Sequence, residues 1–344
     1  MTPSGTLAEP DLEPYRRELT GFCYRMLGSG FEADDAVQET MVRAWRHGES
    51  FEGRSSVRSW LYRIASNVCI DMHRQVQRRA RPMDLGPSSP PFETNLGPVL
   101  VDHPWVMPVN DAAMAPETHD PAELAEHRES IRLAFVTALQ HLPSRQRAVL
   151  ILCEVLRFPA AEVAGMLETS VAAVNSALQR ARARLESLPD APHPGPLDPA
   201  DAELLEAYVE AFQSYDMGRL VELLHEDAVQ SMPPFSMWIQ GAGDITTFMQ
   251  EPAPSSCRGS FLVPLSANGC PAFAQYKPAP EGGYVPWAVQ VLEVHGGRIA
   301  ELAFFLNLCD PERLFPYFGL PLSAEAADLA HLGRSPTPAR APRA

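Results

Sequence analysis

The chain has 344 residues, of which 45% are hydrophobic, and a formal net charge of −15. That length predicts two or three domains with a sizeable core, and the net charge taken alone argues against a polyanionic partner. The charge is unevenly distributed, however. Residues 54–81 hold seven arginines and one aspartate, residues 130–188 hold seven arginines against four glutamates, and residues 201–330 hold five basic residues against seventeen acidic ones. The sequence therefore combines two basic segments with one acidic domain.

The six cysteines are scattered and form no CxxC pair. Buried thiols in a reducing cytoplasm are therefore a simpler interpretation than a metal site or a disulfide framework. The N-terminal residues lack the apolar run of a signal peptide, and no apolar stretch approaches the roughly 20 residues of a membrane span. We expect a cytoplasmic protein without metal, cofactor or membrane contact.

Residues 11–81 are predicted to form an all-α module. From Asp34 to Trp45, apolar residues recur at helical spacing and place Val37, Ala44 and Trp45 on one face. The segment from Ser56 to Gln75 repeats this pattern after a polar loop.

Two proline-rich segments divide the chain. Residues 82–126 contain nine prolines and little periodicity, which predicts an extended linker, and residues 189–200 hold five more prolines. Residues 127–188, between them, should form a second all-α module. It begins with a helix from His127 to His141, and a helix from Arg145 to Leu156 follows, capped by Ser144.

Residues 161–185 predict a helix-turn-helix, with Val163, Ala164, Leu167 and Val174 buried. Thr169 and Ser170 would supply the turn and the N-cap of the second helix. Short side chains near the start of that helix can reach base edges in a major groove, and arginines further along suit phosphates. An ordinary helix pair with a solvated arginine face is the alternative. The candidate DNA-binding residues are Ser170, Ala172, Ala173, Asn175, Ser176, Gln179, Arg180, Arg182 and Arg184.

Residues 201–322 predict an α+β domain, with two helices followed by an antiparallel sheet. The helices are expected at 201–213 and 217–224, and the strands at 228–232, 260–265, 272–276, 286–295 and 298–306. Gly296-Gly297 should form a hairpin turn. We expect residues 323–344 to be a disordered tail.

These motifs, in this order, resemble extracytoplasmic-function sigma factors of RNA polymerase. PSRQRAVLILCEVLRFPAAEVAGMLETSVAAVNSALQRARARL is similar to their region four. ADDAVQETMVRAW followed by FEGRSSVRSWLYRIASNVCIDMHR is similar to their region two. The resemblance covers about residues 11–188 and implies two partners, promoter DNA and the clamp coiled coil and flap of core polymerase. One departure is Glu168, at a turn position where the family usually has glycine.

The resemblance also implies roles for individual residues. Asp35, Gln38 and Glu39 would contact the polymerase clamp, although a solvated helix face is the simpler alternative. The polar loop and the helix after it would bind and melt the minus-ten element, where an extruded base needs polar groups and stacking surfaces. The residues implied are Arg54, Ser55, Ser56, Arg58, Trp60, Arg63, Asn67 and Arg74. For Trp60 a core role is equally open. The helix-turn-helix would read the minus-thirty-five element.

The segment YVEAFQSYDMGRLVELLHEDAVQSMPP resembles the start of SnoaL-like domains, which share a cone fold with NTF2-like proteins. A subset of these sigma factors, of the actinobacterial SigG and SigJ type, carries such an extension, which implies regulation in cis. The aromatic residues that could line a small-molecule pocket are Tyr208, Phe212, Trp238, Tyr276 and Trp287. The candidate acid–base residues show no defensible pairing, so we do not expect an enzyme; they are Asp216, His225, Asp227, Glu293 and His295.

Two other functions stay open at this point. One is a ligand-responsive helix-turn-helix regulator, which would not need the block from Asp34 to Arg74. The other is a sigma factor whose SnoaL-type domain is catalytically active. If the chain is a sigma factor, with or without a catalytically active SnoaL-type domain, its acidic domain could dock on the basic DNA-reading surfaces, because opposite charges favour association.

Overall fold

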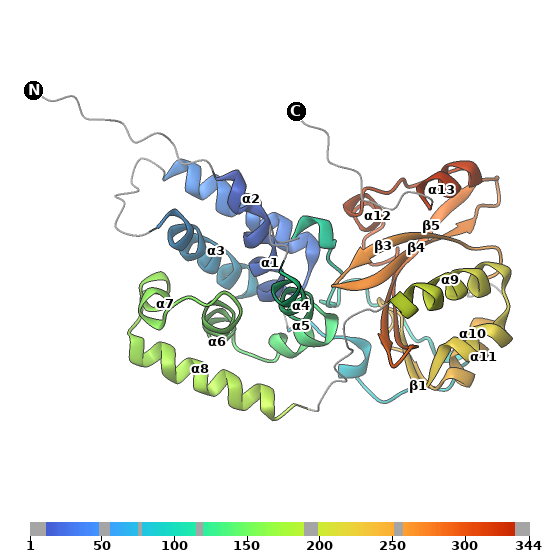
Figure 1. The fold of residues 1–344 in the computed structure, drawn as a ribbon, viewed down its shortest axis with the longest axis horizontal. Helices are drawn as coiled ribbons and strands as arrows, with labels where there is room; N and C mark the ends of the chain where they lie inside the picture. Colours follow the sequence, from blue (N-terminus) through green and yellow to red (C-terminus); the bar gives the residue numbers. More distant parts are fainter. Residues whose placement is uncertain are drawn as a thin grey trace, which may run out of the picture. The chain divides into compact units, whose positions relative to one another are not determined.

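The computed structural model describes residues 12–47, 56–74, 78–114, 120–188, 199–250 and 257–333. The chain forms two compact units (Figure 1). The helical unit comprises residues 1–79 and 113–190, and the sheet unit comprises residues 80–112 and 191–344. Within the described ranges, no helix combines the length and the apolar character needed to cross a bilayer.

Three helices form the first half of the helical unit: α1 (Arg16–Leu27), α2 (Gly30–Arg46) and α3 (Val57–Arg74). Ser29 caps α2, because its hydroxyl accepts the Glu32 N–H at 3.4 Å. The prediction that Trp45 shares one face with Val37 and Ala44 was wrong, since those two residues are buried and the Trp45 side chain is 68% exposed. α2 buries Val37, Thr40 and Ala44, and the next residue lies about 100° around the helix from that face.

The second half of the helical unit contains five helices and one π-turn: α4 (Pro121–Glu129), α5 (Leu133–Gln140), α6 (Ser144–Leu150), the π-turn (Ile151–Val155), α7 (Ala160–Met166) and α8 (Val171–Glu186). The helix expected from His127 to His141 is therefore interrupted between α4 and α5. Pro143, rather than Ser144, is the N-cap of α6, because proline before a helix restricts the chain without needing an N–H donor.

A fully buried arginine joins the two halves of the helical unit. The Arg147 guanidinium donates to the carbonyl of Met26 in α1, to the Gln140 side-chain oxygen at 2.5 Å and to the Leu142 carbonyl at 3.0 Å. Burial lowers the pKa of Arg147 to about 9, and several acceptors compensate for the loss of hydration. The contact with Met26 ties α1 to the helices of the second half.

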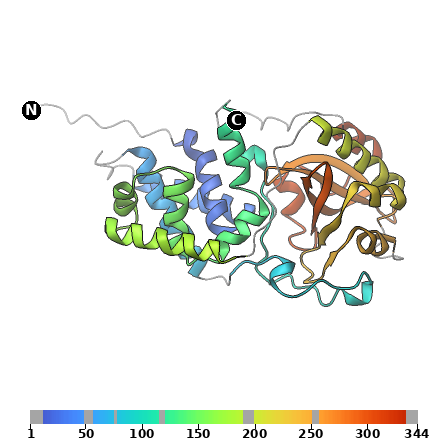
Figure 2. The ribbon, with the colours of Figure 1, turned by 60° about the horizontal axis from the view of Figure 1, so that its bottom comes forward.

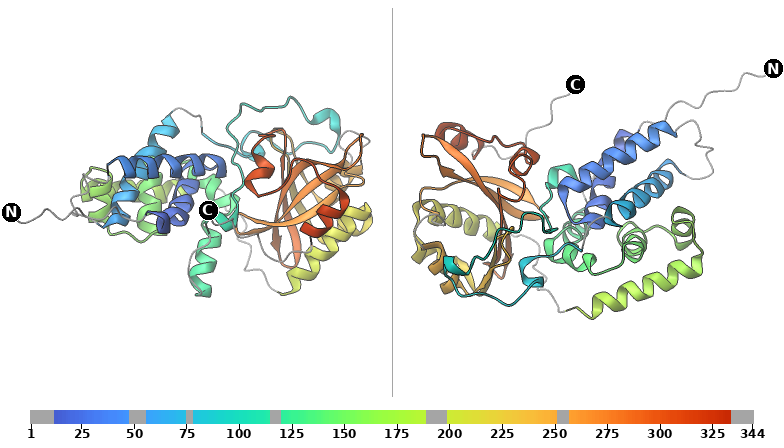
Figure 3. Two further views of the ribbon diagram at one scale, coloured as in Figure 1. Left: turned by 90° about the horizontal axis from the view of Figure 1, so that it is seen from above. Right: turned by 180° about the vertical axis from the view of Figure 1, so that it is seen from behind.

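The sheet unit holds six strands in the order β2-β1-β6-β5-β4-β3. They are β1 (Leu224–Ser231), β2 (Trp238–Gln240), β3 (Phe261–Ala267), β4 (Cys270–Pro278), β5 (Tyr284–His295) and β6 (Arg298–Leu306). The α+β class is confirmed, but the sheet is not wholly antiparallel, because β1 pairs with β6 in parallel. Figure 3 shows the strong curvature of this sheet.

Five helices accompany the strands: α9 (Pro199–Ser214), α10 (Met217–Leu223), α11 (Ala242–Gln250), α12 (Leu314–Tyr317) and α13 (Ala326–Leu332). α9 packs on one sheet face through Tyr208 and Phe212, which share a core with Leu292 and Leu302. The tail was expected to be disordered from residue 323, yet α13 lies within it and buries Leu329 completely. Residues 334–344 lie outside the described ranges.

Residues 80–112 pack on the sheet unit (cyan in Figure 2) and are not the extended linker that the prolines predicted. Ala80 forms a β-bridge with Trp105, and Asn110 forms one with Ala267 of β3. This segment packs on the sheet unit because its apolar side chains are buried: Trp105, Val106 and Val109 are almost fully inaccessible to solvent. Burying such side chains is favourable and orders the backbone around them. α4 also begins inside the stretch expected to be a linker.

Candidate nucleic-acid interface

The helix-turn-helix predicted from the sequence is confirmed. α7 and α8 flank a short turn, and Val163, Ala164, Leu167 and Val174 are all buried. The Ser170 hydroxyl accepts the Ala173 N–H at 3.2 Å, which confirms the predicted N-cap.

The outer face of α8 is open along its whole length. The helix buries Val174 and Ala181 alone, which are seven residues apart and so lie on one face. Ser176 is partly buried and accepts a hydrogen bond from Arg180 at 2.6 Å. The other candidate residues are exposed: Ser170, Ala172, Ala173, Asn175, Gln179, Arg180 and Arg184. This arrangement suits a helix whose N-terminal half enters a major groove.

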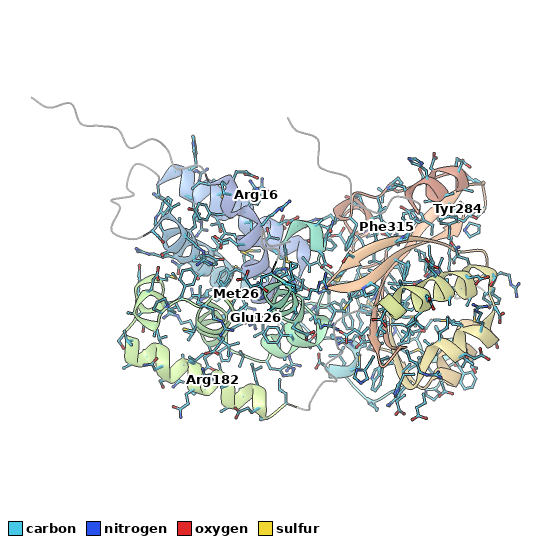
Figure 4. All side chains as sticks on the ribbon, viewed as in Figure 1. Arg16, Met26, Glu126, Arg182, Tyr284 and Phe315 are labelled. Atoms are coloured by element: carbon cyan, nitrogen blue, oxygen red, sulfur yellow. The ribbon has the colours of Figure 1, made fainter. Side chains whose placement is uncertain are left out.

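Arg182 differs from the other arginines of α8. Its guanidinium pairs with the carboxylate of Glu154 in the π-turn at 2.5 Å, and Figure 4 labels its side chain on α8. This arginine therefore already has an anionic partner inside the helical unit, whereas Arg184, half a turn later, forms no ion pair among the residues that the structure describes.

The turn of the helix-turn-helix contacts α3. Glu168 has a left-handed backbone with φ of 50°, which explains why glycine suits this position. Its carboxylate lies 2.5 Å from the Arg63 guanidinium of α3. One turn earlier in α3, the Ser59 hydroxyl donates to the Glu162 carboxylate of α7. The helix implicated in minus-ten binding thus faces the first helix and the turn of the other DNA-binding motif.

Arg58 also points into the helical unit. Its guanidinium donates to Glu18 of α1 at 2.8 Å and lies 4.4 Å from the ring centre of Phe158, a cation–π contact. Two of the arginines implicated in minus-ten binding, Arg58 and Arg63, are therefore engaged within the protein.

The remaining minus-ten candidates lie around the same helix. Ser56 accepts the Ser59 N–H at 3.0 Å, and Arg74 pairs with Asp71 at 3.3 Å on the surface. Trp60 is half-buried and Asn67 is exposed. Arg54 and Ser55 lie outside the described residues.

The residues implicated in polymerase binding share the solvent-facing side of α2. Asp35, Gln38 and Glu39 are exposed, and Glu39 pairs with Arg43 at 2.7 Å along the helix. Trp45 follows Gln38 by seven residues, which places both on one face of the helix. Sequence reasoning missed this exposed tryptophan, although its spacing from Gln38 was a usable signal.

The sheet unit contains a cavity of about 200 Å³ whose wall is almost entirely apolar. Of the five aromatic residues predicted to form a pocket, Trp287 lines it. Tyr208, Phe212 and Tyr276 lie fully buried in the packed interior, and the Trp238 indole donates to the Gly86 carbonyl at 2.8 Å. The complete lining is Leu96, Gln230, Met232, Phe235, Phe248, Met249, Cys257, Trp287, Phe304, Leu306 and Leu308.

The acid–base candidates lie away from this cavity. Asp216 caps α10 by accepting the Arg219 N–H at 3.0 Å. His225 and Asp227 lie on β1, and the Asp227 N–H donates to the His225 ring at 3.2 Å. Glu293 is buried in β5, and His295 is exposed next to the Gly-Gly turn. None of these five residues lines the cavity.

Comparisons with known proteins agree with the order of these modules. Residues 12–79 match Sigma-70 region 2, residues 132–185 match Sigma-70 region 4, and residues 205–302 match the SnoaL-like domain. The ECF RNA polymerase sigma factor SigG of Mycobacterium tuberculosis strain H37Rv is 44% identical over 90% of this chain and 82% of its own length. SigJ of the same strain is 30% identical over 63% of this chain and 62% of its own.

A solved structure supports the fold as well. The crystal structure of SigJ from M. tuberculosis matches with a TM-score of 0.54 and 22% identity, covering 90% of this chain and 98% of that one. The two proteins therefore share their fold.

Proposed function

The chain belongs to the extracytoplasmic-function family of RNA polymerase sigma factors, and on that premise we propose that it directs core polymerase to a subset of promoters under the control of its own SnoaL-like domain. The observation that carries the regulatory part is the packing of residues 80–112. This segment connects the two promoter-reading modules along the chain, yet it is built into the sheet unit.

The two reading modules touch each other in the helical unit. Arg63 of α3 pairs with Glu168 of the helix-turn-helix at 2.5 Å. The minus-ten and minus-thirty-five elements, by contrast, are separated by roughly 25 base pairs, or about 85 Å of B-form DNA. Modules in direct contact cannot occupy both elements at once, so promoter binding requires them to separate.

The length of the chain that connects the two reading modules decides whether they can separate. Fully extended, the residues from Ala80 to Asp120 would reach about 130 Å. The bridge between Ala80 and Trp105 closes a loop, with backbone hydrogen bonds from Ala80 to Pro104 and from Val106 to Ala80, both at 3.1 Å. Closing it removes about 80 Å of that reach. The bridged linker therefore opposes separation, and release of the loop permits it.

Side chains hold both ends of the segment 80–112 on the sheet unit. Arg81 forms an ion pair with Glu301 of β6, and the two side chains are only 11% and 15% exposed. At the other end, the Val109 N–H donates to Asn268 at 3.1 Å and the Gly269 N–H donates to Asp111 at 2.9 Å. Removing one member of a buried ion pair costs about 3–5 kcal/mol, because the other charge stays buried without a partner, so the docked loop needs both Arg81 and Glu301.

In vitro transcription tests this proposal. Core polymerase is combined with the full chain or with a chain ending at Leu188, and transcripts are mapped on a genomic promoter library. We expect both forms to start at the same promoters, with more transcript from the shorter form. Asn175→Ala in each form is the matched control that weakens reading of the minus-thirty-five element. Operator binding without any transcription start would favour the helix-turn-helix regulator instead, and loss of core binding on truncation would make the domain a positive element.

The SnoaL-like domain serves binding rather than turnover in this proposal. The cavity residues that the structure places include no carboxylate and no imidazole. Cys257 is the one lining residue with an ordinary nucleophile, and burial raises the pKa of its thiol, which keeps it protonated and weakly reactive. If the domain were catalytically active, substitution of a cavity residue would abolish a measurable turnover and leave promoter activity intact.

A further inference from the structure

We propose that the cavity of the sheet unit is a binding site for a small, neutral, largely apolar molecule that carries one hydrogen-bond donor, and that its occupancy stabilises the docked linker. The binding site rests on its own geometry. Its regulatory consequence rests on the proposed function above.

The size of the cavity sets the size of the molecule. Its volume is about 200 Å³, and an apolar cavity of about 150 Å³ in a protein core accommodates benzene. Two fused rings or a chain of about ten heavy atoms would fill it. The aromatic rings of Phe235, Phe248 and Trp287 supply much of its wall. Burial of apolar surface against such a wall provides the affinity.

The polarity of the wall sets the chemistry of the molecule. No charged side chain belongs to the placed lining residues, so a buried ionic ligand would lose its hydration without compensation. Gln230 of β1 is the one amide in the wall and is 2% exposed.

The Gln230 side chain is incompletely satisfied. Its amide nitrogen contacts the Met232 sulfur at 3.5 Å, but its carbonyl oxygen accepts no hydrogen bond from any residue that the structure describes. Leaving a buried acceptor without a donor is costly. A hydroxyl or N–H group on the bound molecule would remove that cost, which selects a donor-bearing ligand over a plain hydrocarbon.

One wall of the cavity comes from the linker. Leu96 belongs to the segment 80–112 and packs against the core cluster that includes Phe248 and Leu306. A molecule in the cavity contacts Leu96 only while that segment is docked. A ligand that binds one of two states more tightly shifts the equilibrium toward it. Occupancy therefore favours the docked linker and lowers promoter activity.

The binding claim is tested on the full chain with three probes of similar size. 2-Naphthol carries a donor, 2-methoxynaphthalene carries an acceptor without a donor, and naphthalene carries neither. Calorimetry should show saturable binding, with 2-naphthol about three- to tenfold tighter than the other two. Gln230→Leu should abolish that preference and retain naphthalene binding, which shows that the cavity is intact. Gln240→Leu, on an exposed position of β2, should keep the preference.

Two results would overturn the site. The first is the absence of saturable binding for all three probes. The second is equal affinity for 2-naphthol and naphthalene in the unmodified chain, which would remove the role of Gln230.

The coupling to the linker is tested by proteolysis within residues 80–112. Saturating 2-naphthol should slow cleavage there severalfold and reduce transcript yield, and Leu96→Ala should weaken both effects. Gln230-dependent binding that leaves cleavage unchanged would disprove the coupling and keep the site. Failure of the chain to support transcription at any promoter would disprove the proposed function, independently of the binding data.

Discussion

The Arg63 guanidinium and the Glu168 carboxylate lie 2.5 Å apart and connect α3 with the turn of the helix-turn-helix. Their side chains are 51% and 67% exposed, and an ion pair of that kind contributes only about 0–1 kcal/mol. This pair therefore marks the closed arrangement of the reading modules without enforcing it. The stronger restraint is the linker that connects those modules along the chain.

Two substitutions at Glu168 separate its charge from its backbone conformation. Glu168→Ala removes the ion pair with Arg63 but keeps a Cβ atom at a φ of 50°. Glu168→Gly removes the ion pair and the Cβ atom together. Because glycine adopts left-handed conformations without steric cost, the glycine variant should be about 1 kcal/mol more stable than the alanine variant. Urea unfolding followed in the helical unit measures this difference. Equal stability of the two variants would contradict the left-handed turn.

Glu301→Gln should release the linker loop. The substitution leaves Arg81 charged and mostly buried without its anionic partner, which should destabilise docking by about 3 kcal/mol. Limited proteolysis within residues 80–112 should then be much faster. Arg219→Gln is the matched control, since its ion pair with Glu210 at 3.6 Å is exposed and should be worth about 0–1 kcal/mol.

A double substitution sharpens this test. The double variant Arg81→Gln, Glu301→Gln should be cleaved within residues 80–112 more slowly than the two single accelerations multiplied together would give. The reason is that the second substitution removes the charge that the first left unpaired. Multiplicative effects would show that the two residues act independently.

The recognition helix should separate base reading from phosphate binding. Asn175→Ala and Gln179→Ala should each cost about 1–3 kcal/mol at particular base pairs of the minus-thirty-five element. Arg184→Ala should weaken binding evenly across sequences and reduce its salt dependence. Arg182→Ala is the internal control, since Arg182 is paired with Glu154 and should matter less. Binding assays on an element library at several salt concentrations distinguish these results; a sequence-specific loss for Arg184→Ala would contradict the assignment.

The helical unit should lose stability in mild acid. Burial, followed by the charges of Arg147 and Arg79, lowers the pKa of His73 to about 4. The unfolded chain, with a histidine pKa near 6.5, therefore takes up the proton first. The stability associated with neutral His73 is fully present above pH 6.5 and falls as the pH drops toward 4.

His73→Gln should flatten this part of the pH dependence, and the same change at the exposed His295 should not. Thermal unfolding at pH 7 and pH 5 provides the comparison. An identical loss of stability in the wild type and in His73→Gln would refute the role of His73.

The helix-turn-helix could be predicted from the sequence because its signals are local. Helical spacing identified Val163 and Val174 as buried, and a serine before the second helix identified the cap at Ser170. The packing of residues 80–112 on the sheet unit could not be predicted from such local signals. Prolines and weak periodicity are shared by extended linkers and by segments that pack on another domain. The apolar residues Trp105 and Val109 were the missed signal.

The cavity was largely beyond sequence reasoning, for a different reason. Aromatic residues on amphipathic elements face the packed interior, and this placed Tyr208 and Phe212 in the core rather than in the cavity wall. The wall is assembled from separate elements, with Leu96 from the linker and Gln230 from β1. The parallel pairing of β1 with β6 is equally nonlocal, because it depends on how the intervening strands fold.

Docking of residues 80–112 on the sheet unit is proposed to restrain this sigma factor. The decisive measurement is single-round transcription from a cognate promoter, with core polymerase and equal amounts of the wild type or of Glu301→Gln. We expect more transcript from Glu301→Gln, with the same start site. Equal or reduced transcript from that variant, with proteolysis showing that its loop is released, would contradict the claim.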